Sequence, residues 1–275
     1  MSQDRGYVDV SYLQTAAELL APIKQRSYAL MHIQPGQRVL DVGCGPGIDT
    51  TALGQQVGCK GHVIGVDYDT AMLAAANQRA AQAGVGAWVE HWQGDATALA
   101  FDSGQFDACR SERLFMHLSH PERALAEMVR VTRSGGWIVV LDPDWGTFSV
   151  DTSEVDIERR LARFRAERLL HNGYAGRQLY RLFKQSQLLD IALEPFPVHA
   201  IYYAHIRYLG RLDEVEQQAV ATGVITTAEL HRWQTYLEHA DSSGRCFASL
   251  SLIMAAGRKP SDSTSLETVG GENRE

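Results

Sequence analysis

The chain has 275 residues, of which 45% are hydrophobic and 21% charged, and its formal net charge is −7 at pH 7. This length suits one large domain, or one domain with insertions. The acidic balance and the lack of a basic stripe argue against a nucleic-acid partner, because binding to phosphates needs clustered Lys and Arg. The N-terminus is polar and acidic, and no apolar run approaches the roughly 20 residues that span a bilayer. We expect a cytoplasmic protein without membrane insertion.

The cysteines give no sign of a disulfide framework or of a metal site. None of the four forms a C-x-x-C pair, and none lies near a histidine at the spacing of metal ligands: Cys44, Cys59, Cys109 and Cys246. We therefore expect reduced thiols, as is usual in a reducing compartment, and no bound metal.

Helix and strand signals alternate along the first half of the chain. A helical stretch over residues 11–33, interrupted at Pro22, is followed by five apolar strands. We place these strands at residues 38–42, 62–66, 87–92, 106–110 and 137–141, with helices at 47–58, 70–83 and 121–136 between them. Regular β-α alternation predicts a mostly parallel sheet with helices on both faces.

The alternation breaks after residue 141. We expect helices at residues 153–170, 177–187 and 205–240, the last split at 222–223, and strands at 191–198 and 246–256. Ser153 with Asp156 resembles a helix N-cap, and Thr226 with Glu229 forms a capping-box pattern. The helices near 153–172 and 205–240 have no place in a minimal layered sheet. We interpret them as a cap over the carboxyl edge of the strands.

The strand at 38–42 ends in three alternating glycines, Gly43, Gly45 and Gly47. Glycine is used where a backbone needs a positive φ or lets a ligand approach closely, and such loops after a parallel strand hold nucleotide-like ligands. The nicotinamide pattern G-x-G-x-x-G would require a glycine where this chain has Ile48. Asp41 would in addition repel a pyrophosphate.

The sequence around these glycines resembles the first motif of the class I S-adenosylmethionine-dependent methyltransferases. Four later stretches resemble the landmarks of that family in the same order: 64–67, 94–96, 106–108 and 127–136. The resemblance covers about residues 35–145. It implies a Rossmann-like, mostly parallel seven-stranded sheet with helices on both faces, an inserted helical cap, and S-adenosyl-L-methionine as the cofactor.

The resemblance implies a set of residues for the amino-acid end of the cofactor. Asp41, Gly43 and Gly45 would hold this end, with Asp41 facing the ammonium group. Arg110, at the end of the fourth strand, would line the methionine portion through its backbone.

A second set would hold the nucleoside. Asp67 would accept hydrogen bonds from both ribose hydroxyls. Asp95 would bind the adenine amino group, Ala96 would offer its backbone N–H, and Tyr68 and Met72 would flank the ring. Taken alone, Asp67 could be a helix N-cap and Asp95 a turn residue.

Candidate catalytic residues follow the fourth and fifth strands. His117 is the best candidate for a general base because its ordinary pKa is near neutrality; the alternative is a surface or capping role. Asp142 could orient the acceptor or the base, or it could cap a turn. Nucleic-acid amino-methyltransferases carry an Asn/Asp-Pro-Pro-aromatic tetrad after the fourth strand. This chain has Arg110-Ser111-Glu112-Arg113 there, which favours a small-molecule acceptor.

Polar aromatic residues in the expected cap suggest a planar or phenolic acceptor. We name Tyr174, Arg177, His199 and Tyr203 as substrate-binding candidates, although tyrosines in such positions often only pack. His199 and His205 lack a third ligand for a metal.

We therefore predict an S-adenosylmethionine-dependent methyltransferase that acts on oxygen or nitrogen of a small molecule, a secondary metabolite or a quinone-like compound. Two alternatives remain: a nicotinamide-dependent oxidoreductase and a non-catalytic cofactor-binding protein. We expect helices covering the cofactor site at 1–34, the core at 35–150, the cap and last strands at 151–258, and a disordered tail at 259–275. A homodimer is compatible with the sequence.

Overall fold

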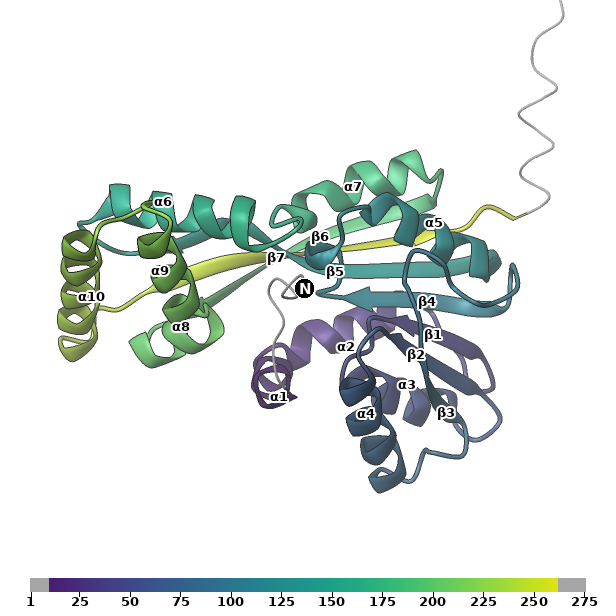
Figure 1. Cartoon of the computed structure of the whole chain (residues 1–275). Coiled ribbons are helices and arrows are strands. Elements are labelled where there is room, and N and C mark those ends of the chain that lie inside the picture. The colour runs from purple at the N-terminus through teal and green to yellow at the C-terminus, as the bar shows by residue number, and fades with distance from the viewer. Residues whose placement is uncertain (1–9, 262–275) are drawn as a thin grey trace, which may run out of the picture.

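The computed structural model describes residues 10–261 and contains a seven-stranded sheet of order β3-β2-β1-β4-β5-β7-β6 (Figure 1). The first five strands pair in parallel, and β7 runs antiparallel to both of its neighbours. The strands are β1 (Arg38–Val42), β2 (His62–Asp67), β3 (Val89–Gln93), β4 (Phe106–Glu112), β5 (Thr132–Val150), β6 (Leu189–Ala200) and β7 (Ala248–Arg258). This confirms the predicted Rossmann-like fold class.

Helices cover both faces of the sheet. One face packs against α5 (Pro121–Val131) and α7 (Ala175–Gln185), whose apolar residues share a core with β1, β4 and β5. The opposite face packs against α2 (Ala21–Leu30), α3 (Ile48–Val57) and α4 (Thr70–Gln82). The helix α1 (Val10–Leu19) precedes α2 and lies near the carboxyl edge of the sheet, where its residues line a cavity.

The last three strands extend beyond the others and carry the cap. Pairing of β5 with β7 continues to Val150 and Ala248, well past the end of β4. Figure 1 shows the cap at this far end of the long strands. It consists of α6 (Val155–Phe164), the π-helical turn η2 (Arg165–Leu169), α8 (Tyr203–Leu209), α9 (Leu212–Ala221) and α10 (Thr227–Ser242). It has its own apolar core around Trp233 and Leu237.

Several predicted boundaries were wrong. The helix at 121–136 ends at Val131, and β5 starts at Thr132 and is 19 residues long because β7 continues to pair with it. The region 205–240 forms three helices, since Arg211 has a φ of +45° and interrupts α8 and α9. Ser153 does not cap α6; the N-cap residue is Glu154. The capping box of Thr226 and Glu229 is confirmed.

Lys259, the first residue of the predicted disordered tail, contacts the core. The ammonium group of Lys259 donates hydrogen bonds to the carbonyls of Val129, at 2.8 Å, and of Thr132, at 2.7 Å. Residues 1–9 and 262–275, which include the rest of that tail, lie outside the described residues. The division of the chain at residues 34, 150 and 258 stays a prediction. Within residues 10–261, no helix is both long and apolar enough to cross a membrane.

Candidate active site

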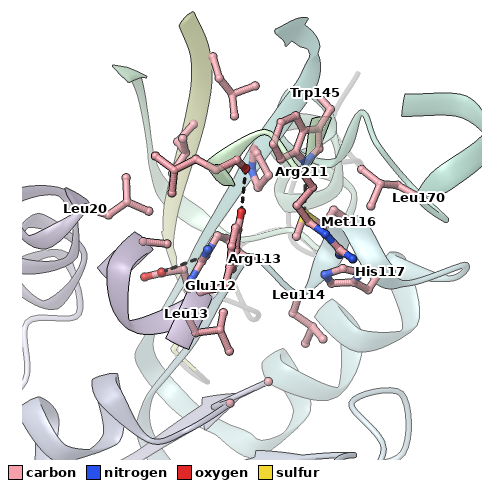
Figure 2. Close-up of a pocket in the computed structure, with 18 of the residues that line it drawn as sticks. Leu13, Leu20, Glu112, Arg113, Leu114, Met116, His117, Trp145, Leu170 and Arg211 are labelled. Atoms are coloured by element: carbon pink, nitrogen blue, oxygen red, sulfur yellow. Dashed lines mark hydrogen bonds and ion pairs between the residues drawn. The ribbon is translucent and has the colours of Figure 1, made fainter. Parts of the chain in front are cut away.

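A cavity of about 700 Å³ lies at the carboxyl edge of the sheet, where β1, β2 and β4 end. Its lining comes from α1, the loop after β1, the start of α4, the turn after β4 and the inner side of the cap. Figure 2 shows Leu13 and Leu20 on one side, with Trp145, Arg211 and His117 grouped on the other. The cavity therefore joins the glycine loop to the cap, and its size is typical of a small-molecule site.

The glycine loop forms one wall of this cavity. Gly43 and Gly45 line it with φ values of +74° and +51°, which other residues rarely adopt. A Cβ atom on Gly43 would lie 3.1 Å from the Leu114 side chain. The Asp67 carboxylate accepts the Gly45 N–H at 2.8 Å and also lines the cavity. Gly47 does not line it, because it packs directly against Ala76 of α4.

The residues predicted around the nucleoside are only partly brought together. Asp67, Tyr68 and Met72 line the cavity, with Tyr68 exposed and Met72 buried. Asp95 and Ala96 do not line it. The Asp95 carboxylate instead accepts hydrogen bonds from the backbone N–H and the hydroxyl of Thr97, 2.8 Å each, in the turn after β3. Binding of the adenine by Asp95 and Ala96 stays a prediction.

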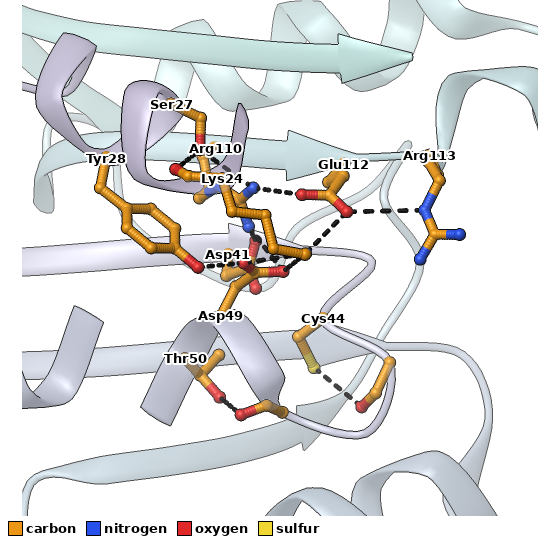
Figure 3. Close-up of polar contacts among 12 residues, drawn as sticks. Lys24, Ser27, Tyr28, Asp41, Cys44, Asp49, Thr50, Arg110, Glu112 and Arg113 are labelled. Atoms are coloured by element: carbon orange, nitrogen blue, oxygen red, sulfur yellow. Dashed lines mark hydrogen bonds and ion pairs between the residues drawn. The ribbon is translucent and has the colours of Figure 1, made fainter. Parts of the chain in front are cut away.

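A network of buried charges lies under the cavity and connects α2, α3 and β4 (Figure 3). Lys24 Nζ is 2.8 Å from Asp49 Oδ2 and 2.7 Å from Glu112 Oε1. Arg110 Nη1 is 2.9 Å from Asp49 Oδ2 and 3.4 Å from Asp41 Oδ1. Lys24, Asp49 and Glu112 line the cavity, whereas Asp41 and Arg110 do not.

The side chains of Asp41 and Arg110 thus do not reach the cavity, and contacts of these two residues with the cofactor stay predictions. The strand β4 runs two residues beyond Arg110, so Glu112 reaches the carboxyl edge in its place. Both Asp41 and Arg110 are 1% exposed and face each other below the loop. No local pattern shows which charged residue of a strand or helix will reach a cavity, so Glu112 of β4, Asp49 of α3 and Lys24 of α2 were missed.

Burial and charge act in opposite directions on the carboxyl groups of this network. Burial raises the pKa of Asp41 to about 7, against the attraction of Arg110. Burial alone would also raise the pKa of Asp49, but the charges of Arg110 and Lys24 hold it below its usual range. The pKa of Glu112 is likewise lowered, because Lys24 and Arg110 outweigh its burial. The two carboxylates at the cavity are thus kept ionised.

His117 and Asp142 both belong to or contact the short turn after β4, but only His117 lines the cavity. His117 ends the 3₁₀ turn η1 (Phe115–His117) and lines the cavity. Asp142 is buried and does not line it; its carboxylate accepts the N–H groups of Phe115 and Met116, both at 3.0 Å. Asp142 therefore caps this turn, and its part in orienting an acceptor or a base stays a prediction. The sequence left the capping role open, but it did not show that Asp142 caps the turn at Phe115 and Met116.

Of the four substrate-binding candidates, His199 lines the cavity and the other three do not. The Tyr174 hydroxyl donates to Glu167 at 3.0 Å. Arg177 Nε donates to Asp144 at 2.6 Å.

Tyr203, the third candidate that does not line the cavity, is buried in the core of the cap. Its hydroxyl accepts a hydrogen bond from Arg207. Internal partners hold these three side chains away from the cavity, and their contacts with a substrate stay predictions. His205 does line it, as do Trp145 and Arg165, which sequence reasoning missed. Within residues 10–261, no three His, Cys, Asp or Glu side chains are grouped so that they could hold a metal ion.

Comparison with known sequences identifies relatives of the chain. Residues 40–140 match the family model of the methyltransferase domain. An uncharacterised 37.1 kDa protein in transposon Tn4556 of Streptomyces fradiae is 31% identical over 253 residues, which cover 91% of this chain and 71% of that protein. The ubiquinone/menaquinone biosynthesis C-methyltransferase of Vibrio cholerae is 35% identical over 109 residues. That match covers 40% of this chain and 42% of the relative, less than half of either.

A solved structure supports the same fold. The geranyl diphosphate C-methyltransferase of Streptomyces coelicolor superposes with a TM-score of 0.56 over 90% of this chain and 82% of that chain, at 16% sequence identity. It was solved with Mg²⁺, geranyl diphosphate and S-adenosyl-L-homocysteine. At this identity the likeness shows the fold alone.

Proposed function

This chain belongs to the class I S-adenosylmethionine-dependent methyltransferases, and we propose that it methylates an apolar small molecule held between the glycine loop and the cap. The observation that carries the proposal is the continuity of the cavity. It reaches from Gly45 and Asp67 at the sheet edge to Trp145 and Ile206 beside the cap. Such a cavity places a cofactor and an acceptor side by side, as a direct transfer between them requires.

The residues at the sheet edge fit the cofactor. The glycine loop offers a backbone surface without side chains, and Asp67 lies beside it with a carboxylate suited to ribose hydroxyls. Tyr68 and Met72 would flank the adenine. The ionised carboxylate of Glu112 would face the amino-acid end and attract its ammonium group.

The acceptor would lie at the cap end, where most lining residues are apolar. Trp145, Phe148, Leu170 and Ile206 contribute to this part of the wall. Such a lining suits the secondary metabolite or quinone-like compound that the sequence suggested, methylated on oxygen or nitrogen. The similarity to quinone C-methyltransferases adds carbon as a third candidate atom.

His117 is the proposed general base, because it lines the cavity between the glycine loop and the cap. S-adenosylmethionine supplies a methyl group already activated on a sulfonium. The protein therefore has to align the acceptor, exclude water, and remove a proton where the acceptor is a hydroxyl. Met116 and Trp145 line the same cavity as His117 and contact each other, and their apolar surfaces would help to exclude water.

The test is incubation of the protein with isotope-labelled S-adenosylmethionine and a metabolite extract, followed by mass spectrometry. A labelled product whose yield at low cofactor concentration falls with the Asp67→Ala variant would support the proposal. Binding of S-adenosylhomocysteine without any labelled product would point to the non-catalytic alternative. Thermal stabilisation by NADH but not by S-adenosylhomocysteine would point to the oxidoreductase.

A further inference from the structure

We propose that Arg165 binds an anionic oxygen group of the acceptor, so that the substrate is an apolar molecule carrying one carboxylate or phosphate. This inference rests on the proposed function, because it concerns the cap end of the same cavity. Arg165 begins the π-helical turn η2 and lines the cavity wall. None of the family motifs includes this position.

The first observation is that Arg165 is a buried cation that forms no ion pair with a carboxylate of the described residues. Within residues 10–261, three lysine or arginine residues are buried: Lys24, Arg110 and Arg165, the last 6% exposed. Lys24 and Arg110 each form ion pairs with carboxylates at 2.9 Å or less. Arg165 forms no ion pair with any residue that the structure describes. A buried charge without a counter-ion is costly, so an anion that enters the cavity would be stabilised by pairing with Arg165.

The second observation is that the guanidinium of Arg165 is held in a defined position. Its central carbon lies 3.3 Å from the centre of the Trp145 ring. Its Nη1 donates a hydrogen bond to the carbonyl of Gly210. Both partners line the cavity as well. These contacts orient the guanidinium without neutralising it, which leaves its remaining N–H donors for a bidentate partner.

The third observation is that the residues around Arg165 are mostly apolar and that the nearby Arg211 has its own carboxylate partner. Arg211 is neutralised by Glu214, whose Oε2 lies 2.5 Å from Arg211 Nη2. Glu214 attracts Arg165 without forming an ion pair with it, and although burial lowers the pKa of Arg165 to about 9, the group is still protonated at neutral pH. The wall around it is otherwise largely apolar: Phe148, Leu169, Leu170, Ile206 and Leu209. An acceptor with an apolar body and one negative charge matches both features, whereas a neutral one would leave the guanidinium unpaired.

The test compares three ligands of similar shape with the full chain saturated with S-adenosylhomocysteine. Isothermal titration calorimetry would measure 1-naphthaleneacetate, its neutral amide 1-naphthaleneacetamide, and 1-naphthyl phosphate. We expect one of the two anions to bind about tenfold or more tightly than the amide, the range for a charged hydrogen bond. The stronger of the two tells whether the natural group is a carboxylate or a phosphate.

The Arg165→Met variant should lose this preference for the anion while it still binds the cofactor product. Arg163→Met is the matched control, because Arg163 is an exposed arginine two residues earlier. If Arg165→Met does not fold, Arg165→Gln replaces it. Equal affinities of wild-type protein for anion and amide, or no measurable binding of either anion, would overturn the inference. Failure of S-adenosylhomocysteine to bind would instead count against the proposed function.

Discussion

Arg110 and Glu112 lie two residues apart in β4, and Arg110 Nη2 is 2.8 Å from Glu112 Oε2. Alternate residues of a strand point to the same face, so both side chains lie below α2, where Lys24 joins them. This arrangement buries Arg110 completely and leaves the Glu112 carboxylate at the floor of the cavity. The proposed amino-acid end of the cofactor site therefore rests on a network of charges shared by α2, α3 and β4.

Replacing Glu112 with glutamine should reduce both stability and cofactor affinity. The change removes one negative charge from between Lys24 and Arg110, and breaking a buried ion pair typically costs about 3–5 kcal/mol. Urea unfolding and calorimetry with S-adenosylhomocysteine would measure the two effects. Glu122→Gln is the control, because Glu122 is exposed and its loss should change stability by no more than about 0.5 kcal/mol. Equal unfolding midpoints for Glu112→Gln and wild type would contradict the structural role of the network.

Removing the Asp67 carboxylate should weaken S-adenosylhomocysteine binding by about 1.5–3 kcal/mol, the range for charged hydrogen bonds. Part of this loss would come through the loop, because Asp67 also fixes the Gly45 N–H. Calorimetry on Asp67→Ala would measure it. Asp102→Ala, at an exposed turn away from the cavity, serves as the control. An unchanged dissociation constant for Asp67→Ala would exclude this residue from the cofactor site.

The His117→Ala substitution should slow methyl transfer to a hydroxyl by a factor of about 10² to 10⁴, with little change in KM, if His117 removes the proton. Single-turnover rates with the acceptor found in the labelling experiment would measure this. His120→Ala is the matched control, because His120 is an exposed histidine three residues further on. A wild-type rate for His117→Ala would leave His117 as part of the cavity wall only.

Asp142 should make stability depend on pH. Burial raises its pKa to about 7, although the N–H groups of Phe115 and Met116 lower it. The folded protein then holds a proton that the unfolded chain releases near pH 4, so this group contributes stability at low pH that is lost as the pH rises to about 7. Asp142→Asn removes the titration. The free energy of unfolding of Asp142→Asn minus that of wild type should therefore be larger at pH 8 than at pH 4.

Urea unfolding of both proteins at pH 4, 6 and 8 would measure this difference. Asp102→Asn should follow the wild-type curve at each pH, because Asp102 is exposed. A constant difference between Asp142→Asn and wild type over this range would show that the carboxyl group titrates as in the unfolded chain.

The prediction of the core depended on signals that act within a few residues of each other. The positive φ values at Gly43 and Gly45 and the capping box at Thr226 follow from backbone sterics and local hydrogen bonds, so they were readable from the sequence. The alternation of strands and helices likewise predicted the sheet. Boundaries such as the end of β5 were not readable, because they depend on the length of the partner strand β7.

The sequence by itself determined the family, the glycine loop and the position of Asp67 at the end of β2, because each depends on neighbouring residues along the chain. Only the tertiary structure decided which side chains reach the cavity. Glu112 replaced Arg110 there, and Arg165 was placed over Trp145 from a part of the chain without any motif. These outcomes depend on packing and charge pairing between segments tens of residues apart, and no local pattern contains that information.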